Sequence, residues 1–348
     1  TLMRSRFRLL LAALALVLTV ITGGVIFLAM GKDPSTALYI YFVEPLTTTS
    51  GLSEVAVKAG PLILIGIGLS FGFRAGIWNI GAEGQYIAGA IAGGGLAVYF
   101  YESESTLLLP AMLVLGTLGG MAWAAVPALL KTRFNANEIL VSLMLVYVAE
   151  LLLVHLVQGP WRNPQGWGFP GTRLFPDAAT MPLLFSGKRV HLGTLITLAV
   201  PFIAWFILAR TRFGFTVRVF GSAPLAARHA GVHGHRMIWQ SLLIGGGLAG
   251  LAGVIEATST IGQLVPNISP GYGFTAIIVA FLGRLHPLGV LLAGIAIAVT
   301  YIGGEGAQIS AGLPKAVTSL FQGIILFYLL AFDLFTRYRI IVSSRATE

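Results

Sequence analysis

Asn79, Glu83 and Gln85 are three polar side chains set within seven residues of a strongly apolar chain. They belong to the stretch FRAGIWNIGAEGQYIAGA, residues 73–90, which also carries Arg74 and several glycines. Two amides and a carboxylate can hydrogen-bond a polar solute. Placing such groups in hydrocarbon is costly, so a membrane protein that keeps them there is expected to use them. The stretch is therefore the first place to expect function.

Two interpretations of this stretch follow from its residues. In one, Gly76, Gly81 and Gly84 break a helix, and the freed backbone faces a water-filled path together with the polar side chains. In the other, the same side chains lock helices together and touch no solute. A second polar interruption, residues 271–288, hints at an internal repeat without establishing one.

The elements that must position these residues are membrane helices. The chain is 56% hydrophobic and 10% charged, whereas soluble domains carry about 25% charged residues. We expect one all-α transmembrane domain over residues 1–348, with about ten membrane-spanning helices and no soluble domain. The candidate segments are 9–30, 54–74, 80–100, 106–130, 137–158, 191–210, 238–261, 272–283, 287–304 and 314–332. Segment 272–283 is too short to cross alone, and residues 34–50 are expected at the membrane interface.

The charge pattern predicts the orientation. A net charge of +9 would suit a nucleic-acid partner, but the positive-inside rule accounts better for where the charges fall. With the N-terminus inside, fifteen of the 22 Lys and Arg residues fall on the cytoplasmic side. Both termini are therefore expected in the cytoplasm. Segment 9–30 is long enough to be a retained first helix rather than a signal peptide.

Two loops are long enough to have roles of their own. The outer loop, 159–190, is rich in Pro and aromatic residues and could cover the extracellular mouth. The inner loop, 211–237, predicts a short helix with Ser222 as its N-cap, Pro224 in its first turn and Gly231 at its end. Such a helix is too short to be stable alone. It is either a docking element for a cytoplasmic partner or an ordinary connector.

Other chemistries find little support. The chain has no cysteine and no GxxxxGK[ST] phosphate-binding loop, so any ATP would be hydrolysed by another subunit. Glu150 and His155 do not share a helix face well and have no evident third metal ligand. We expect no enzyme activity, no cofactor and no metal.

Five ordered motifs carry a family resemblance. They are FRAGIWNIGAEGQYIAGA (73–90), NEILVSLMLVY (137–147), GFTVRVFGSAPLAARHAGV (214–232), LAGLAGVIE (248–256) and GYGFTAIIVAFLGRLHPLGVLLAG (271–294). Over about residues 54–332 the chain resembles the permease subunits of bacterial ABC importers, in the branch that moves nucleosides and simple sugars. Branched-chain amino-acid permeases are more distant relatives.

The resemblance implies an importer of the bacterial cytoplasmic (inner) membrane that works by alternating access. Its partners would be two cytoplasmic ATPases, a second permease chain that is usually different but related, and an extracytoplasmic solute-binding protein. Residues 222–231 would then be the coupling helix. The coupling candidates are Ser222, Pro224, Ala226, Ala227, Arg228 and Gly231, and the substrate-pathway candidates are Asn79, Glu83, Gln85 and Tyr272. Relatives often have asparagine where this chain has Val146, so a specificity difference is expected if that position touches solute.

Three alternatives remain at this point. The first is a branched-chain amino-acid substrate, which would need partners for both an ammonium and a carboxylate. The second is an ion-coupled secondary transporter with Glu83, Glu150 or Glu256 as the coupling carboxylate. The third is a membrane enzyme acting on a lipid or polyprenyl substrate, although no catalytic motif in the sequence indicates one.

Overall fold

The computed structural model describes residues 2–337, and helices make up almost all of the regular structure there. The exception is a single antiparallel bridge between Leu183 and His191. The expected all-α class is confirmed. Arg339, Arg345 and the C-terminal end, which entered the charge count, lie outside the described residues. The long helices are α1 (Leu2–Ala29), α4 (Thr49–Arg74), α5 (Ala82–Tyr99), α6 (Leu108–Phe134), α7 (Glu138–Gln158), α8 (Leu192–Arg210), α11 (Gly234–Glu256), α13 (Pro287–Ala311) and α14 (Ala316–Arg337).

Each of the ten candidate segments coincides with a helix. Within the described residues, six helices are long and apolar enough to cross a membrane: α4, α6, α7, α8, α11 with its extension to Ile261, and α13. The chain is thus a multi-pass membrane protein. The exact number of crossings stays a prediction, because α12 (Tyr272–Leu282) has only 11 residues and α5, with 18, begins with the polar residues Glu83 and Gln85.

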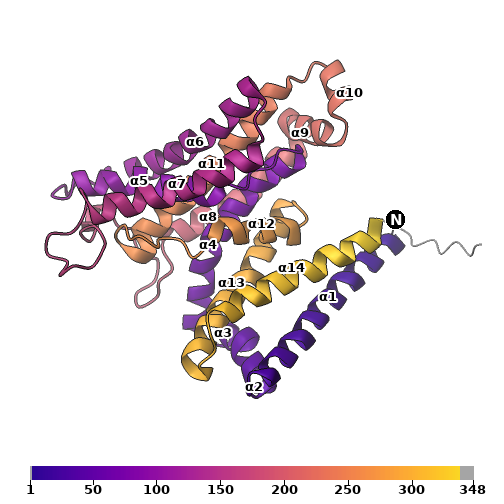
Figure 1. The fold of residues 1–348 in the computed structure, drawn as a ribbon, viewed down its shortest axis with the longest axis horizontal. Coiled ribbons are helices and arrows are strands. Elements are labelled where there is room, and N and C mark those ends of the chain that lie inside the picture. Colours follow the sequence, from indigo (N-terminus) through magenta and orange to yellow (C-terminus); the bar gives the residue numbers. More distant parts are fainter. Residues whose placement is uncertain (1, 338–348) are drawn as a thin grey trace, which may run out of the picture. The chain divides into compact units, whose positions relative to one another are not determined.

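Residues 2–51 and 299–337 form one compact unit. In its described part, α1 and α14 lie side by side (Figure 1). Its core is aromatic: the ring centroids of Phe27 and Phe321 are 5.4 Å apart, and those of Tyr41 and Phe321 are 4.8 Å apart. Tyr41 comes from the short helical run α2 (Pro34–Leu38), η1 (Tyr39–Val43) and α3 (Glu44–Thr47). This run, expected at the interface, supplies core residues to the unit.

Residues 52–298 form the second unit, with α4 at its centre. Almost every side chain from Ala59 to Phe73 is buried, as expected of a helix that is apolar on all faces. Glycines let its neighbours approach closely. A Cβ added at Gly66 would lie 3.0 Å from Val290 of α13, and one added at Gly68 would lie 3.1 Å from Gly245 of α11.

Helices α5, α6 and α11 pack together beside α4 (Figure 1). Their backbones meet at glycines: Gly89 of α5 faces Gly250 of α11, and Gly120 of α6 faces Gly246 of α11. Small residues are what membrane helices use for such close crossings. These glycines therefore allow the close packing of α5, α6 and α11.

The short segment near residue 272 is a half-helix. Gly271 begins α12 with a backbone φ of +95°, so the helix does not extend backward through Asn267. Eleven residues reach only about 16 Å at 1.5 Å per residue, which is about half of a bilayer core. The polar turn before α13 then reverses the chain, with Arg284 and Leu285 both at positive φ.

Candidate functional site

The polar stretch lies in the connection from α4 to α5. Helix α4 ends at Arg74, and Gly76, at a φ of +72°, turns the chain into an extended segment that leads to Ala82. Arg74 Nε donates a hydrogen bond of 2.7 Å to the carbonyl oxygen of Leu285. The helix break expected at Gly76 and Gly81 is present, whereas Gly84 is helical and lies against the backbone of Val146.

The extended segment folds back along α4. A Cβ on Gly245 would lie 3.1 Å from Asn79 Nδ2 and 3.6 Å from the carbonyl oxygen of Gly68. Gly68 precedes the end of α4 by six residues, about 9 Å along the helix axis. Asn79 therefore lies inside the helix bundle, and only the Arg74 end of the stretch is near the end of α4.

Asn79 and Gln85 bind each other through their side-chain amides. Asn79 Nδ2 donates to Gln85 Oε1 at 2.8 Å, and Gln85 Nε2 donates to Asn79 Oδ1 at 3.1 Å. The same Asn79 oxygen accepts from the backbone N–H of Gly81 at 3.1 Å. Both side chains are at least 98% buried. Polar groups buried in this way need such partners, and the pair holds the turn onto α5 in one conformation.

Glu83 lies where the N-termini of two helices meet. It is in the first turn of α5, and its Oε2 accepts a hydrogen bond of 2.5 Å from the backbone N–H of Gly273 in the first turn of α12. Helix N-termini favour a negative charge. Glu83 therefore joins two elements that are far apart in the sequence.

Tyr272 connects Glu83 to further polar groups that the sequence did not bring together. Its ring packs edge-on against Tyr86 with centroids 6.0 Å apart, and Lys58 Nζ lies 5.7 Å from the ring centroid. Glu256, at the end of α11, is 95% buried and accepts from Thr260 Oγ1 at 3.4 Å. Tyr86 and Lys58 were missed because each is a single residue in an apolar helix, with no local motif to mark it.

Val146 does not face an open path in this chain. It is 99% buried, and Gly84 of α5 packs against its backbone. The specificity effect expected at this position depended on solute contact, and it stays a prediction.

The inner loop contains two short helices. These are α9 (Arg212–Ser222) and α10 (Pro224–His229). Pro224 begins α10, and Gly231, at a φ of +84°, ends the turn that follows it, both as expected. The N-cap assignment of Ser222 was wrong: Ala223 is the N-cap of α10, while Ser222 ends α9 and donates to the carbonyl of Val219.

Four of the six coupling candidates, Pro224, Ala226, Ala227 and Arg228, lie on α10, while Ser222 ends α9 and Gly231 follows α10. Ala227 is fully buried, while Ala226 and Arg228 are exposed. Helix α9 is held by Arg218, whose Nη1 donates to the carbonyl oxygen of Leu208 near the end of α8 at 2.9 Å. Gly221 packs against the carbonyl oxygen of Arg74 so closely that no side chain would fit. The inner loop thus contacts the turn that carries Asn79.

The outer loop is pinned to residues 258–264. Backbone N–H groups of Thr172, Phe175 and Met181 donate to carbonyls of that segment at 2.7–3.0 Å. Arg189 also forms an ion pair of 3.0 Å with Glu54. The loop is therefore an ordered cover on this end of the second unit.

Comparison with known proteins identifies the class. Residues 51–330 match the family described as the branched-chain amino acid transport system permease component. The chain belongs to this family. It is 38% identical to the glucose ABC transporter permease of Haloferax volcanii over 340 residues, 95% of this chain and 87% of the relative. It is 29% identical to the guanosine ABC transporter permease of Bacillus subtilis over 326 residues, 92% of each chain.

Within the family, the chain is a permease of the nucleoside and simple-sugar branch. A nucleoside ABC transporter permease of Lactococcus lactis is also 25% identical over 330 residues, 92% of this chain and 90% of that one. Among solved structures, a metal-chelate type ABC transporter in an inward-facing conformation aligns over 95% of this chain and 99% of its own, at 19% identity and a TM-score of 0.46. That likeness is too weak to support an argument.

Proposed function

We propose that this chain is the transmembrane permease subunit of an ABC importer that takes up a nucleoside or a simple sugar. The observation that carries the proposal is near full-length similarity to permeases named for glucose and guanosine. The amides of Asn79 and Gln85 are the candidate solute-binding groups, because uncharged amides suit a hydroxyl-rich solute better than fixed charges do, and their mutual hydrogen bonds would have to open for solute to bind.

The energy would come from a separate ATPase pair in the cytoplasm. The sequence contains no phosphate-binding loop of its own. Helices α9 and α10 are the proposed contact for these subunits, because α10 is short, exposed and basic, while α9 touches the turn after α4. Movement of α9 would thereby reach the segment that holds Asn79. A second permease chain and a solute-binding protein would complete the importer of the cytoplasmic membrane.

One observation favours a second candidate, a branched-chain amino acid. Lys58, Glu83 and Glu256 all lie around the tyrosine pair Tyr86–Tyr272, so groups for a carboxylate and for an ammonium are present in one region. Against this, Glu83 already binds the N-terminus of α12.

The test is uptake by the reconstituted complex. The permease is co-expressed with an ATPase, a second permease and a solute-binding protein from its own organism, and radiolabelled guanosine, glucose and leucine are offered to proteoliposomes. We expect ATP-dependent uptake of guanosine or glucose that survives a protonophore. A complex whose ATPase lacks its phosphate-binding lysine serves as the control. Uptake of leucine alone would favour the second candidate, and uptake without ATP that collapses with the protonophore would refute both.

A further inference from the structure

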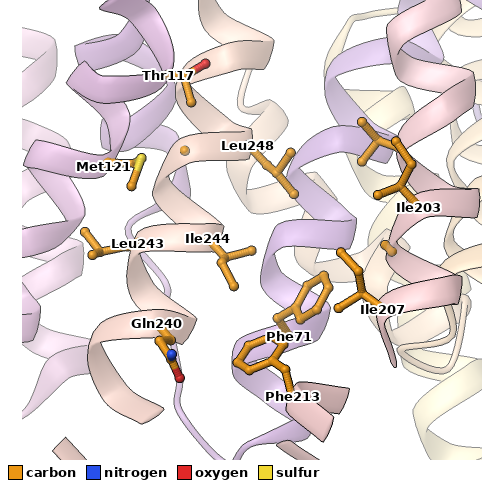
Figure 2. A pocket seen from close by; sticks show the side chains of 13 residues that line it. Phe71, Thr117, Met121, Ile203, Ile207, Phe213, Gln240, Leu243, Ile244 and Leu248 are labelled. Atoms are coloured by element: carbon orange, nitrogen blue, oxygen red, sulfur yellow. The ribbon is translucent and has the colours of Figure 1, made fainter. Parts of the chain in front are cut away.

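A large groove opens on the side of the second unit, away from the polar residues just described. Its volume is about 620 Å³, within the range of sites that hold small molecules. Helix α11 forms one wall, with Ile244 and Leu248, and α8 forms the other, with Ile203 and Ile207 (Figure 2). Thr117 and Gln240 are the only polar side chains among the lining residues.

The two ends of the groove differ. Phe71 of α4 and Phe213 of α9 stack with ring centroids 6.1 Å apart, and they form the floor of the groove at the end that carries Gln240 (Figure 2). This is the end at which α8 stops and α9 begins, and it faces the cytoplasm in the predicted orientation. The opposite end, near Thr117 and Leu248, leads toward the middle of the membrane.

The length of the groove corresponds to one leaflet. From Gln240 to Leu248, α11 rises about 12 Å at 1.5 Å per residue. Half of the hydrocarbon core of a bilayer is about 15 Å thick. One acyl chain of the cytoplasmic leaflet would therefore fill the groove from its mouth to near the membrane midplane, whereas a sugar or nucleoside would find almost no hydrogen-bonding partner there.

Arginines surround the cytoplasmic end. Arg210 lies one helical turn beyond Ile207 on α8, and Arg236 lies one turn before Gln240 on α11, so each extends a wall of the groove. Arg212 is next to Phe213 in the floor. All three are exposed, and within the described part of the chain none forms an ion pair. The sequence contains no acidic residue from Ala178 to Ile255, so α8, α9 and α11 up to Ile255 bring no carboxylate of their own to these arginines.

From this arrangement we infer that the groove is a binding site for an anionic phospholipid of the cytoplasmic leaflet, with one acyl chain between α8 and α11 and the phosphate at Arg210, Arg212 and Arg236. Guanidinium groups bind phosphate oxygens in a paired geometry, and they are less strongly hydrated than ammonium groups. A lipid in this position would contact α8, α9 and α11 together, and it would support α9 against the bundle.

The test measures lipid retention by native mass spectrometry of the permease purified in mild detergent and mixed with phosphatidylglycerol or phosphatidylcholine. We expect the wild type to retain phosphatidylglycerol preferentially. The double variant Arg210→Gln/Arg236→Gln should bind it more weakly by about fivefold per arginine, which corresponds to about 1 kcal/mol for each basic residue near an anionic surface. Arg133→Gln, an exposed arginine at the end of α6, is the matched control and should bind as the wild type does.

A second variant tests the apolar part. Ile244→Trp fills the groove and should abolish cross-linking of the chain by a phosphatidylglycerol that carries a photoreactive group on its acyl tail. Leu292→Trp, an exposed site on α13, should leave the cross-link unchanged. Equal retention of the two lipids would overturn the inference, and so would an unaltered cross-link in Ile244→Trp. In the assembled importer, a cross-link from the groove to the second permease chain would also overturn it. Solute uptake is measured separately, so failure here leaves the proposed function standing.

Discussion

Asn79 and Gln85 show how a polar pair can be accommodated inside an apolar bundle. Each amide uses the other as its partner, and the pair fixes the turn between α4 and α5. Solute contact at these residues stays a prediction. If they do bind solute, their mutual hydrogen bonds would have to open, which would keep affinity low and release fast. Weak binding suits the proposed importer, in which a solute-binding protein would supply the affinity.

A double-mutant cycle measures the interaction energy between Asn79 and Gln85 apart from their contacts with the surroundings. Asn79→Leu or Gln85→Leu alone leaves a buried amide without its partner, which costs about 1–3 kcal/mol. The double variant should lose less than the sum of the two, with a coupling of about 0.5–3 kcal/mol. Thermal unfolding of the four proteins in detergent measures this coupling. Strict additivity of the two losses would show that the two amides do not stabilise each other.

His191, just before α8 on the outer side, predicts a pH effect. Burial, with a smaller contribution from the charge of Arg189, lowers the pKa of His191 to about 4 from 6.5. The unfolded chain therefore takes up the proton first, and the neutral folded form loses stability as the pH falls from about 6.5 toward 4. Between pH 7 and pH 5 the loss is about 2 kcal/mol.

The measurement compares unfolding midpoints of the wild type and His191→Asn at both pH values. The wild type should lose more stability on acidification than the variant does, because only the wild type has His191. The contributions of the other titrating groups cancel in the difference. An identical loss in the two proteins would contradict the lowered pKa.

At the scale of elements, the interruptions define the architecture more than the long helices do. Gly76 and Gly271, both at positive φ, lie next to a helix end and a helix start, and Glu83 joins the two polar interruptions by its bond to Gly273. The sequence marked both interruptions by composition. It could not show that they meet, because the two lie about 190 residues apart and only packing brings them together.

Helix α10 was predicted nearly correctly, and its error has a local cause. Pro224 and Gly231 mark its start and stop by backbone geometry that few other residues tolerate. Ser222 is a good N-cap by type, but the tertiary structure continues α9 through it. The 11-residue helix α9 was not predicted, because its basic and apolar residues match a loop as well as a helix.

The coupling role of α10 can be tested at Gly231. Its φ of +84° is strained for any β-branched residue, so Gly231→Val should distort the end of α10 and abolish stimulation of the partner ATPase by solute-loaded binding protein. Arg228→Glu should do the same by reversing an exposed charge. Gly187→Val, at a φ of +75° in the outer loop, introduces similar strain away from α10 and is the matched control. Full stimulation in both inner-loop variants would exclude α10 as the coupling element.

At the scale of the whole molecule, orientation follows from charge, and it can be checked directly. The chain has no cysteine, so single cysteines introduce unique labels. Ser222→Cys in the inner loop should react with a membrane-impermeant maleimide only in inside-out vesicles, and Ser186→Cys in the outer loop only in intact cells. Both positions are exposed, while fully buried Ala249→Cys should stay unlabelled until denaturation. The opposite labelling pattern would invert the topology.

The sequence by itself determined the class of this protein: an all-α, multi-pass permease of the nucleoside and simple-sugar branch, with a short helix at Pro224. The helices, the multi-pass character and the short helix follow from hydropathy, charge and turn geometry in neighbouring residues, whereas the branch follows from the resemblance of five ordered motifs to known permeases. Tertiary structure decided which polar groups meet. The pairing of Asn79 with Gln85, the bond from Gly273 to Glu83 and the groove between α8 and α11 all depend on how closely helices approach. Close approach depends on the fit of whole surfaces, which no local pattern of residues specifies.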